Sequence, residues 1–190
     1  LNDRRLGRLQ IEAVNRQAAV SAQESVREWR LNTLSLTVPE ARLQASGNWA
    51  AQAGAREGMP RRTALKVQLQ IDDAGALLAR FGMAGVIRGG KGTLGGNVGW
   101  LGSPLSMDVP SLSGELELDL QRGQFLKADP GIAKLLGVLS LQSLPRRLVL
   151  DFRDVFSEGF AFDAVRGNAR IAQGVASTNN LQMKGVSAAV

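Results

Sequence analysis

The sequence contains no cysteine and no histidine. Without cysteine the chain cannot form a disulfide or a thiolate metal site. Without histidine it lacks the most common general base and the most common metal ligand of proteins. We therefore expect no metal ion, no cofactor and no enzymatic activity.

The chain also lacks long apolar runs and concentrated charge of one sign. No stretch approaches the roughly 20 apolar residues that a membrane-spanning helix needs. The 23 basic and 17 acidic residues give a net charge of +6, but they are interspersed without a basic block or arm. Because nucleic-acid-binding proteins concentrate such charge on one face or stretch, we expect no nucleic-acid partner. A weak attraction to anionic lipid surfaces remains compatible with the charge.

Two familiar ligand-binding or catalytic motifs are approached but not completed. Residues 85–92 have the glycine and lysine spacing of a phosphate-binding loop, but Gly92 stands where that loop requires Ser or Thr. We interpret this segment as a turn that leads into a curved strand. The serines have no histidine to activate them, and no Ser-x-x-Lys run offers a lysine base instead.

The densest acidic group, in residues 151–163, could be taken for the paired carboxylates of a glycosidase. Arginines are interleaved with these carboxylates, so cross-strand ion pairing is the simpler interpretation. The residues expected to form such structural ion pairs are Arg146, Arg147, Asp151, Arg153 and Asp154.

Alternation of apolar and polar residues dominates the chain and predicts strands with one apolar and one polar face. The clearest case is Leu65 to Ile71. The same pattern is present in residues 4–14, 29–38 (with a bulge near 32–33), 43–49, 94–100, 112–120, 148–152, 160–163 and 169–171. Turn signals at 157–159, 166–168 and 173–174 predict an antiparallel meander at the C-terminal end. Residues 15–25 have no apolar stripe and are predicted to form a hairpin connection or a mobile loop.

Two short helices interrupt the strands. The first is predicted over residues 73–82, capped by Asp72-Asp73, with Leu77, Leu78 and Phe81 at helical spacing. The second is predicted over residues 129–141, where Asp129-Pro130 is a strong start signal. We therefore expect one segment, 1–190, with first strands in 1–72, a helix at 73–82, strands in 85–121, a helix at 129–141 and strands in 145–190.

A sheet of about eight such strands exposes one long apolar face that two short helices cannot cover. That face must roll up, pack against another layer or hold something apolar. Periodicity alone does not distinguish a closed core from an open groove. The three tryptophans, Trp29, Trp49 and Trp100, have the same ambiguity: core packing is the favoured interpretation, and a place at the rim of a groove is the alternative.

The stretch from Pro145 to Gly185 reads PRRLVLDFRDVFSEGFAFDAVRGNARIAQGVASTNNLQMKG. Together with Leu6-Gly7 and residues 29–36, 45–49 and 123–139, it resembles the C-terminal region of the YhdP proteins, AsmA-like proteins of Gram-negative bacteria. The resemblance covers nearly the whole chain. It implies that the chain is a segment of a longer, periplasmic protein that is anchored in the inner membrane by a part outside these residues.

The resemblance also implies a fold and a function. The fold is mainly β: a long antiparallel twisted sheet curved into a U-shaped hydrophobic groove (β-taco-like), with two short amphipathic helices. The function is that of a lipid-binding segment in a periplasm-spanning bridge, which transports phospholipid between inner and outer membranes and so supports the outer-membrane barrier. The expected partners are phospholipid acyl chains, the membrane surface, and proteins of the outer or inner membrane.

On this reading, alternation selects the residues that line the groove. They are Leu94, Val98, Trp100, Leu116, Leu118, Leu120, Leu148, Leu150, Phe152, Phe160 and Phe162. The alternative is a structural or assembly module for outer-membrane biogenesis, in which the same side chains form a closed β core without lipid cargo.

Overall fold

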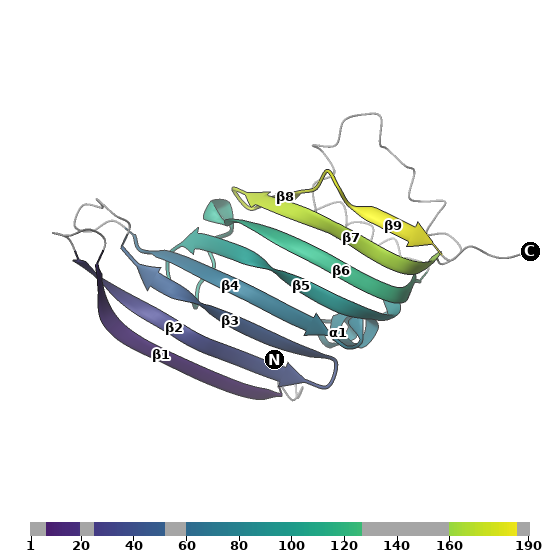
Figure 1. Cartoon of the computed structure of the whole chain (residues 1–190), viewed down its shortest axis with the longest axis horizontal. Coiled ribbons are helices and arrows are strands. Elements are labelled where there is room, and N and C mark those ends of the chain that lie inside the picture. The colour runs from purple at the N-terminus through teal and green to yellow at the C-terminus, as the bar shows by residue number, and fades with distance from the viewer. Residues whose placement is uncertain (1–6, 20–24, 52–59, 127–159, 186–190) are drawn as a thin grey trace, which may run out of the picture.

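The computed structural model describes residues 7–19, 25–51, 60–126 and 160–185, which form one open, curved antiparallel sheet (Figure 1). Its strands are β1 (Arg8–Ala19), β2 (Ser25–Val38), β3 (Ala41–Ala50), β4 (Arg62–Ile71), β5 (Ile87–Leu101), β6 (Ser113–Phe125), β7 (Phe160–Ala172), β8 (Val175–Ser177) and β9 (Gln182–Gly185). The prediction of a mainly β, antiparallel sheet is confirmed.

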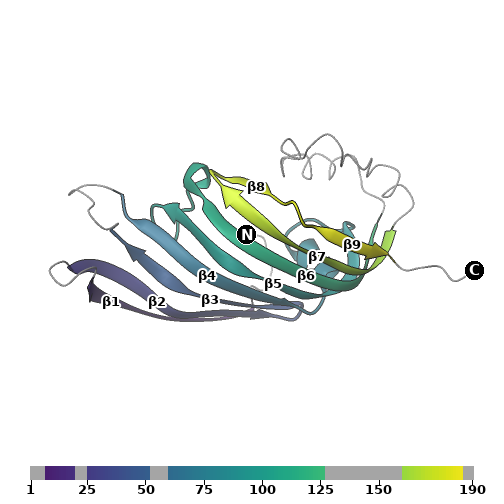
Figure 2. The same ribbon diagram turned by 45° about the horizontal axis from the view of Figure 1, so that its top comes forward.

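The strands follow one another in the sheet in chain order. The order runs from β1 to β8 without a crossover, and β9 pairs with β7 beyond the short β8. Figures 1 and 2 show the neighbouring strands side by side in this order. In this antiparallel order, apolar positions such as Leu43, Leu69 and Leu94 lie beside one another on neighbouring strands.

Strand β4 shows why the sequence folds in this way. From Leu65 to Ile71 its side chains alternate between apolar residues that are partly or fully buried and polar residues that are exposed. On either side, Leu69 lies opposite Leu43 of β3 and opposite Leu94 of β5. Since a slip of one residue would turn every one of these leucines to the other face, the apolar pattern fixes the register.

Helix α1 (Ala74–Arg80) lies within the predicted range 73–82. The Asp73 side chain caps it by accepting a 2.9 Å hydrogen bond from the backbone N–H of Ala76, and Gly82 follows it with φ of +88°. Phe81 does not join the apolar side of the helix as predicted, because it is the C-cap residue and is 70% exposed. The second predicted helix, 129–141, lies outside the described residues.

The best-packed part of the structure lies under α1. Its buried residues come from β4, α1, β6 and β7: Ile71, Ala74, Leu120, Phe162 and Val165. The rings of Phe125 and Phe162 pack with their centroids 5.0 Å apart. Within the described ranges, neither α1 nor the short 3-10 helix η1 (Val109–Ser111) is long and apolar enough to cross a membrane.

Two loop or turn predictions are wrong. Residues 15–19 continue β1 as a strand, because their backbone pairs in register with β2 whatever their side chains. Residues 166–168 lie inside the uninterrupted strand β7. Gly167 is there because Leu181 packs closely over it: a Cβ at this position would lie 2.7 Å from the Cα of Leu181.

Other local predictions are confirmed. The register of β2 against β3 shifts between Leu31 and Leu34, which is the predicted bulge. Gln173 and Gly174 form the turn between β7 and β8. Residues 85–92 run from a turn at Gly85 into β5, as predicted for this segment.

Charged side chains tie the sheet to its connections. The Arg80 guanidinium of α1 lies 2.7 Å from Glu40, which follows β2, and lowers the pKa of that carboxyl. The pKa of the buried Glu28 is also lowered, first by a hydrogen bond from Asn48 and then by Arg16. The predicted ion pairs of residues 146–154 lie outside the described residues.

Because the pKa values of Glu28 and Glu40 are lowered, we expect the folded chain to lose stability in acid. Their pKa values in the folded chain lie below the ordinary 4.5, so their stabilisation is complete above that pH and is lost as the pH falls through the lower, folded values. We expect the melting temperature to fall below about pH 4.5. In the Glu40→Gln variant the fall should be shallower. In Glu117→Gln, which changes an exposed glutamate outside the ion pairs described for this chain, it should be unchanged. An equal slope in Glu40→Gln would contradict this assignment.

Candidate functional site

The strand registers place the apolar side chains of β2 to β7 on one face of the sheet, here called the apolar face. Three neighbouring rows cross the strands on this face, and together we call them the apolar band. The first row is Leu36, Leu43, Leu69, Leu94 and Leu118. The second is Leu34, Ala45, Val67, Gly96, Leu116 and Ala169. The third is Leu31, Gly47, Leu65, Val98, Gly114 and Ile171.

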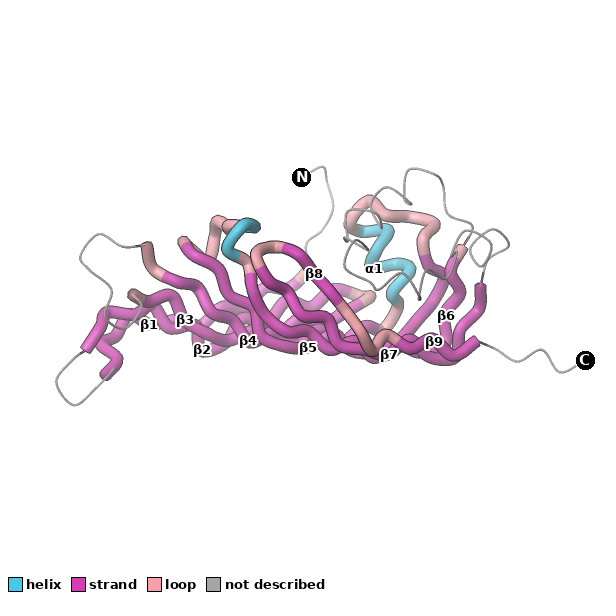
Figure 3. The backbone as a smooth tube through the Cα atoms, turned by 90° about the horizontal axis from the view of Figure 1, so that it is seen from above, coloured by secondary structure: helices cyan, strands magenta, loops and turns pink. Residues whose placement is uncertain are grey.

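Protein covers the apolar face at both ends of the strands. At one end α1 packs over the sheet, so that Ile71 and Leu120 are no more than 8% exposed. At the other end the connection between β5 and β6 folds over Trp100, whose indole N–H donates to the carbonyl of Ser103 at 3.0 Å. Figure 3 shows α1 and the other cyan segment, η1, on the same side of the sheet.

Between these covers the apolar band is half-buried. Apart from Leu31, which is 3% exposed, every residue of the three rows has intermediate exposure. The band therefore extends across six strands as an apolar strip that the surrounding protein only partly encloses. A contiguous apolar patch that stays accessible on a protein surface often marks a binding site.

The structure places seven of the residues predicted to line a groove on the face of the sheet that carries α1. Leu94, Val98, Leu116 and Leu118 lie in the half-buried band, whereas Trp100 and Leu120 share its face but are enclosed by the covers at its two ends. Phe162 is 1% exposed and belongs to the core under α1. The backbone of Phe160 pairs with Phe125. The remaining candidates, Leu148, Leu150 and Phe152, lie outside the described residues.

The first half of the chain contributes as much to the band as β5 and β6 do. The prediction did not include Leu36, Leu43, Leu69 or the rows beside them. The signal was present, because these residues alternate with polar ones in the same way. What the sequence does not contain is the register, which joins them to Leu94 and Leu118 in one continuous surface.

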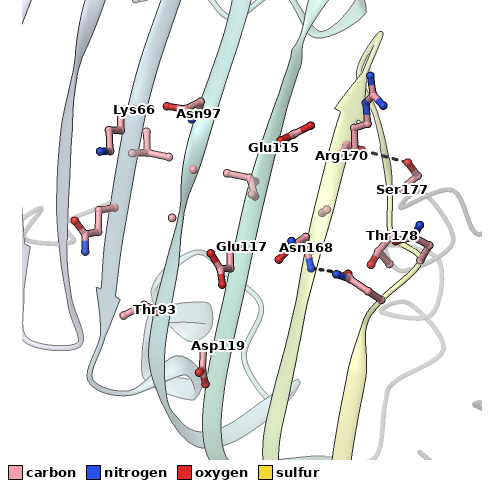
Figure 4. A pocket seen from close by; sticks show the side chains of 18 residues that line it. Lys66, Thr93, Asn97, Glu115, Glu117, Asp119, Asn168, Arg170, Ser177 and Thr178 are labelled. Atoms are coloured by element: carbon pink, nitrogen blue, oxygen red, sulfur yellow. Dashed lines mark hydrogen bonds between the residues drawn. The ribbon is translucent and has the colours of Figure 1, made fainter.

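The opposite face of the sheet is polar. It has a shallow hollow of about 1060 Å³, and Figure 4 shows the side chains that line it, among them Lys66, Asn97, Glu115, Glu117 and Arg170. Next to it Arg166 of β7 lies 2.9 Å from Asp119 of β6. A hydrogen bond from Gln121, followed by this arginine, lowers the pKa of Asp119. No group of carboxylates in the described part of the chain is arranged to hold a metal ion.

The faces of the sheet thus differ in chemistry. One carries paired charges and amides, which suits contact with water. The other carries an aliphatic strip with no hydrogen-bonding side chain in its three rows, which suits contact with hydrocarbon. The arrangement supplies apolar contact rather than a reacting group.

Comparisons with known proteins identify the family. The model of a protein family described as "YhdP protein" matches residues 1–190. The chain is 34% identical over 149 residues to the intermembrane phospholipid transporter YhdP of Escherichia coli (strain K12). That match covers 78% of this chain and 11% of the relative, so the chain corresponds to a small part of the relative's length. No solved structure matches. The chain belongs to the YhdP protein family.

Proposed function

We propose that this chain is a lipid-binding segment of a periplasm-spanning bridge that carries phospholipid between the inner and outer membranes. The observation that carries the proposal is the apolar band, which is continuous from β2 to β7 and only half-buried. The E. coli relative, an intermembrane phospholipid transporter, supports the assignment of phospholipid as the cargo.

The proposed mechanism is shielding of acyl chains from water. Each buried methylene is stabilised by about 0.8 kcal/mol, so a whole acyl chain meets a large barrier to crossing water alone. A lipid whose tails lie on the aliphatic rows keeps most of that stabilisation while it moves. No covalent step is needed, and this agrees with the absence of histidine and cysteine from the chain.

In this proposal the apolar band is the floor of a groove, and the covers at its two ends are the walls. Helix α1 closes one side, and the β5–β6 connection with η1 closes the other. Lipid then moves across the strands, from one strand to the next, rather than along any one of them. The protein partners would be membrane proteins that deliver or receive lipid at the ends of the sheet.

Native mass spectrometry of the purified chain, with extraction and analysis of bound lipid, tests the proposal. We expect phospholipid to be retained through purification and to be released by denaturation, because the band has no other apolar partner in the described structure. A lipid-free, monodisperse and stably folded chain that takes up no added phospholipid would contradict it. That result would instead favour a structural or assembly module with a closed core.

A further inference from the structure

Beyond the third row of the apolar band, towards the β5–β6 connection, lies a row that contains the three tryptophans. Trp29 of β2 pairs with Trp49 of β3, and Thr63 of β4 separates them from Trp100. Trp100 is 3% exposed and its N–H is bound to Ser103, so it is part of the core. Trp29 and Trp49 are only half-buried. The row is therefore buried at Trp100 and partly exposed at Trp29 and Trp49.

The indole nitrogen of Trp49 is shielded from solvent, and none of the described residues accepts a hydrogen bond from it. A shielded, unpaired donor is costly, and such groups are uncommon in native proteins. An oxygen atom of a ligand lying beside the ring would supply the acceptor that the described residues do not.

Two arginines border this tryptophan pair on the apolar side of the sheet. The Arg61 guanidinium carbon lies 4.8 Å from the centroid of the Trp49 ring. Arg27 is two residues before Trp29 on β2 and so projects from the same face. Neither belongs to the ion pairs that the structure describes. The nearby Glu28 faces the other side, where it binds Arg16 and Asn48.

The end of the band under α1 is different. There the Arg80 guanidinium is paired with Glu40 at 2.7 Å, so its charge is balanced within the protein. Among the described residues, Arg27 and Arg61 place positive charge that no described ion pair balances next to indole rings. Indole rings favour the boundary between hydrocarbon and polar groups, and guanidinium groups bind phosphate oxygens through charge-assisted, often bidentate hydrogen bonds.

We propose that Arg27 and Arg61, with Trp29 and Trp49, form a binding site for the phosphate group of a phospholipid whose acyl chains lie on the apolar band. This site, here called the headgroup rim, rests on the proposed function and adds to it an orientation for the lipid. The phosphate lies along the edge of the groove at the tryptophan end of the strands. The tails extend across the leucine-rich rows towards α1.

Binding of three probes to the purified chain tests the headgroup rim: short-chain phosphatidylglycerol, the diacylglycerol with the same tails, and inorganic phosphate. The NMR signals of the tryptophan indole N–H groups report the position of the ligand, and Trp100 is an internal reference. We expect phosphatidylglycerol to bind about tenfold more tightly than the diacylglycerol, as one charge-assisted contact would give. It should also shift the Trp49 signal more than the Trp100 signal.

The double variant Arg27→Gln, Arg61→Gln should lose this tenfold preference and still bind the diacylglycerol. Trp49→Phe keeps an aromatic ring and removes the indole N–H, so it should weaken the preference for phosphatidylglycerol. The NMR signal that disappears in this variant is that of Trp49. The matched control is Arg42→Gln, Lys66→Gln, which removes two exposed positive charges from the polar face and should leave the preference intact.

The outcomes separate this inference from the proposed function. Equal binding of both lipids, or a preference that survives loss of both arginines, would overturn the headgroup rim and leave lipid binding in place. Failure of both lipids to bind would overturn the proposed function itself. If inorganic phosphate shifts the Trp49 signal with the affinity of phosphatidylglycerol, the site binds free phosphate and the lipid assignment is wrong.

Discussion

Replacing Leu43 and Leu94 together by Asp is expected to abolish phospholipid retention while the chain remains folded. Both leucines lie in the first row of the apolar band, both are half-buried, and Leu69 lies between them in the sheet. Neither belongs to the packed core under α1. A carboxylate next to an acyl chain loses much of its hydration without gaining a partner, which costs several kcal/mol per site. Lipid per chain, measured by native mass spectrometry, should fall by more than tenfold.

The matched control places the same two charges on the other face of the same strands. Gln44 and Thr93 are the neighbours of Leu43 and Leu94, and both are exposed. The Gln44→Asp, Thr93→Asp chain should retain lipid like the unmodified protein, with a similar melting temperature and circular dichroism spectrum. If the leucine variant retained lipid at an unchanged stoichiometry, the apolar band would not be the lipid-binding surface. If that variant unfolds, Leu94→Asn alone provides the same comparison with a smaller perturbation.

A single methyl group at Gly96 should destabilise the chain by about 3 kcal/mol or more. Gly96 lies in the second row of the band with φ of +150°, which residues with a side chain avoid. A Cβ built there would lie 2.0 Å from the carbonyl oxygen of Glu115 on β6. Gly96→Ala must therefore separate β5 from β6, at the centre of the sheet, to relieve the clash. Denaturant unfolding followed by circular dichroism measures the loss.

The preceding residue provides the control for this prediction. At Gly95 a Cβ would lie 3.6 Å from the Val67 carbonyl oxygen, an ordinary contact. Gly95→Ala should therefore change the free energy of unfolding by no more than about 1 kcal/mol, and the smaller freedom of the unfolded chain could make that change stabilising. Equal effects of the two substitutions would show that the close approach of β5 to β6 does not constrain the sheet.

The features that the sequence predicts correctly are those written in short local patterns. Alternation from Leu65 to Ile71 predicts β4 and its apolar face, and Asp72-Asp73 followed by an apolar helical pattern predicts α1. Each depends on a few neighbouring residues and on backbone geometry that is the same in all proteins. For the same reason, the alternation in β5 and β6 was enough to place Leu94 and Leu118 on one face.

The features that it does not predict depend on partners distant in the chain. Residues 15–19 have no apolar stripe and still form strand, because β2 offers a continuous set of backbone hydrogen bonds. Gly167 resembles a turn residue until Leu181, which is distant in the sequence, packs over it. Likewise, nothing local to Trp49 or Arg61 reveals that the Arg61 guanidinium, just before β4, lies over the Trp49 ring on the neighbouring strand β3. Register and long-range packing decide all three.

The order of the strands has a consequence for how such a surface can grow. Because the apolar rows run across the strands, the length of the strip depends on the number of strands, whereas its width depends on the number of residues between α1 and the β5–β6 connection. Neighbouring strands lie about 4.8 Å apart, so each added hairpin would lengthen the strip by about 10 Å and leave its width unchanged. A meander can therefore span a longer distance by the addition of further hairpins. Each added hairpin extends the same apolar surface.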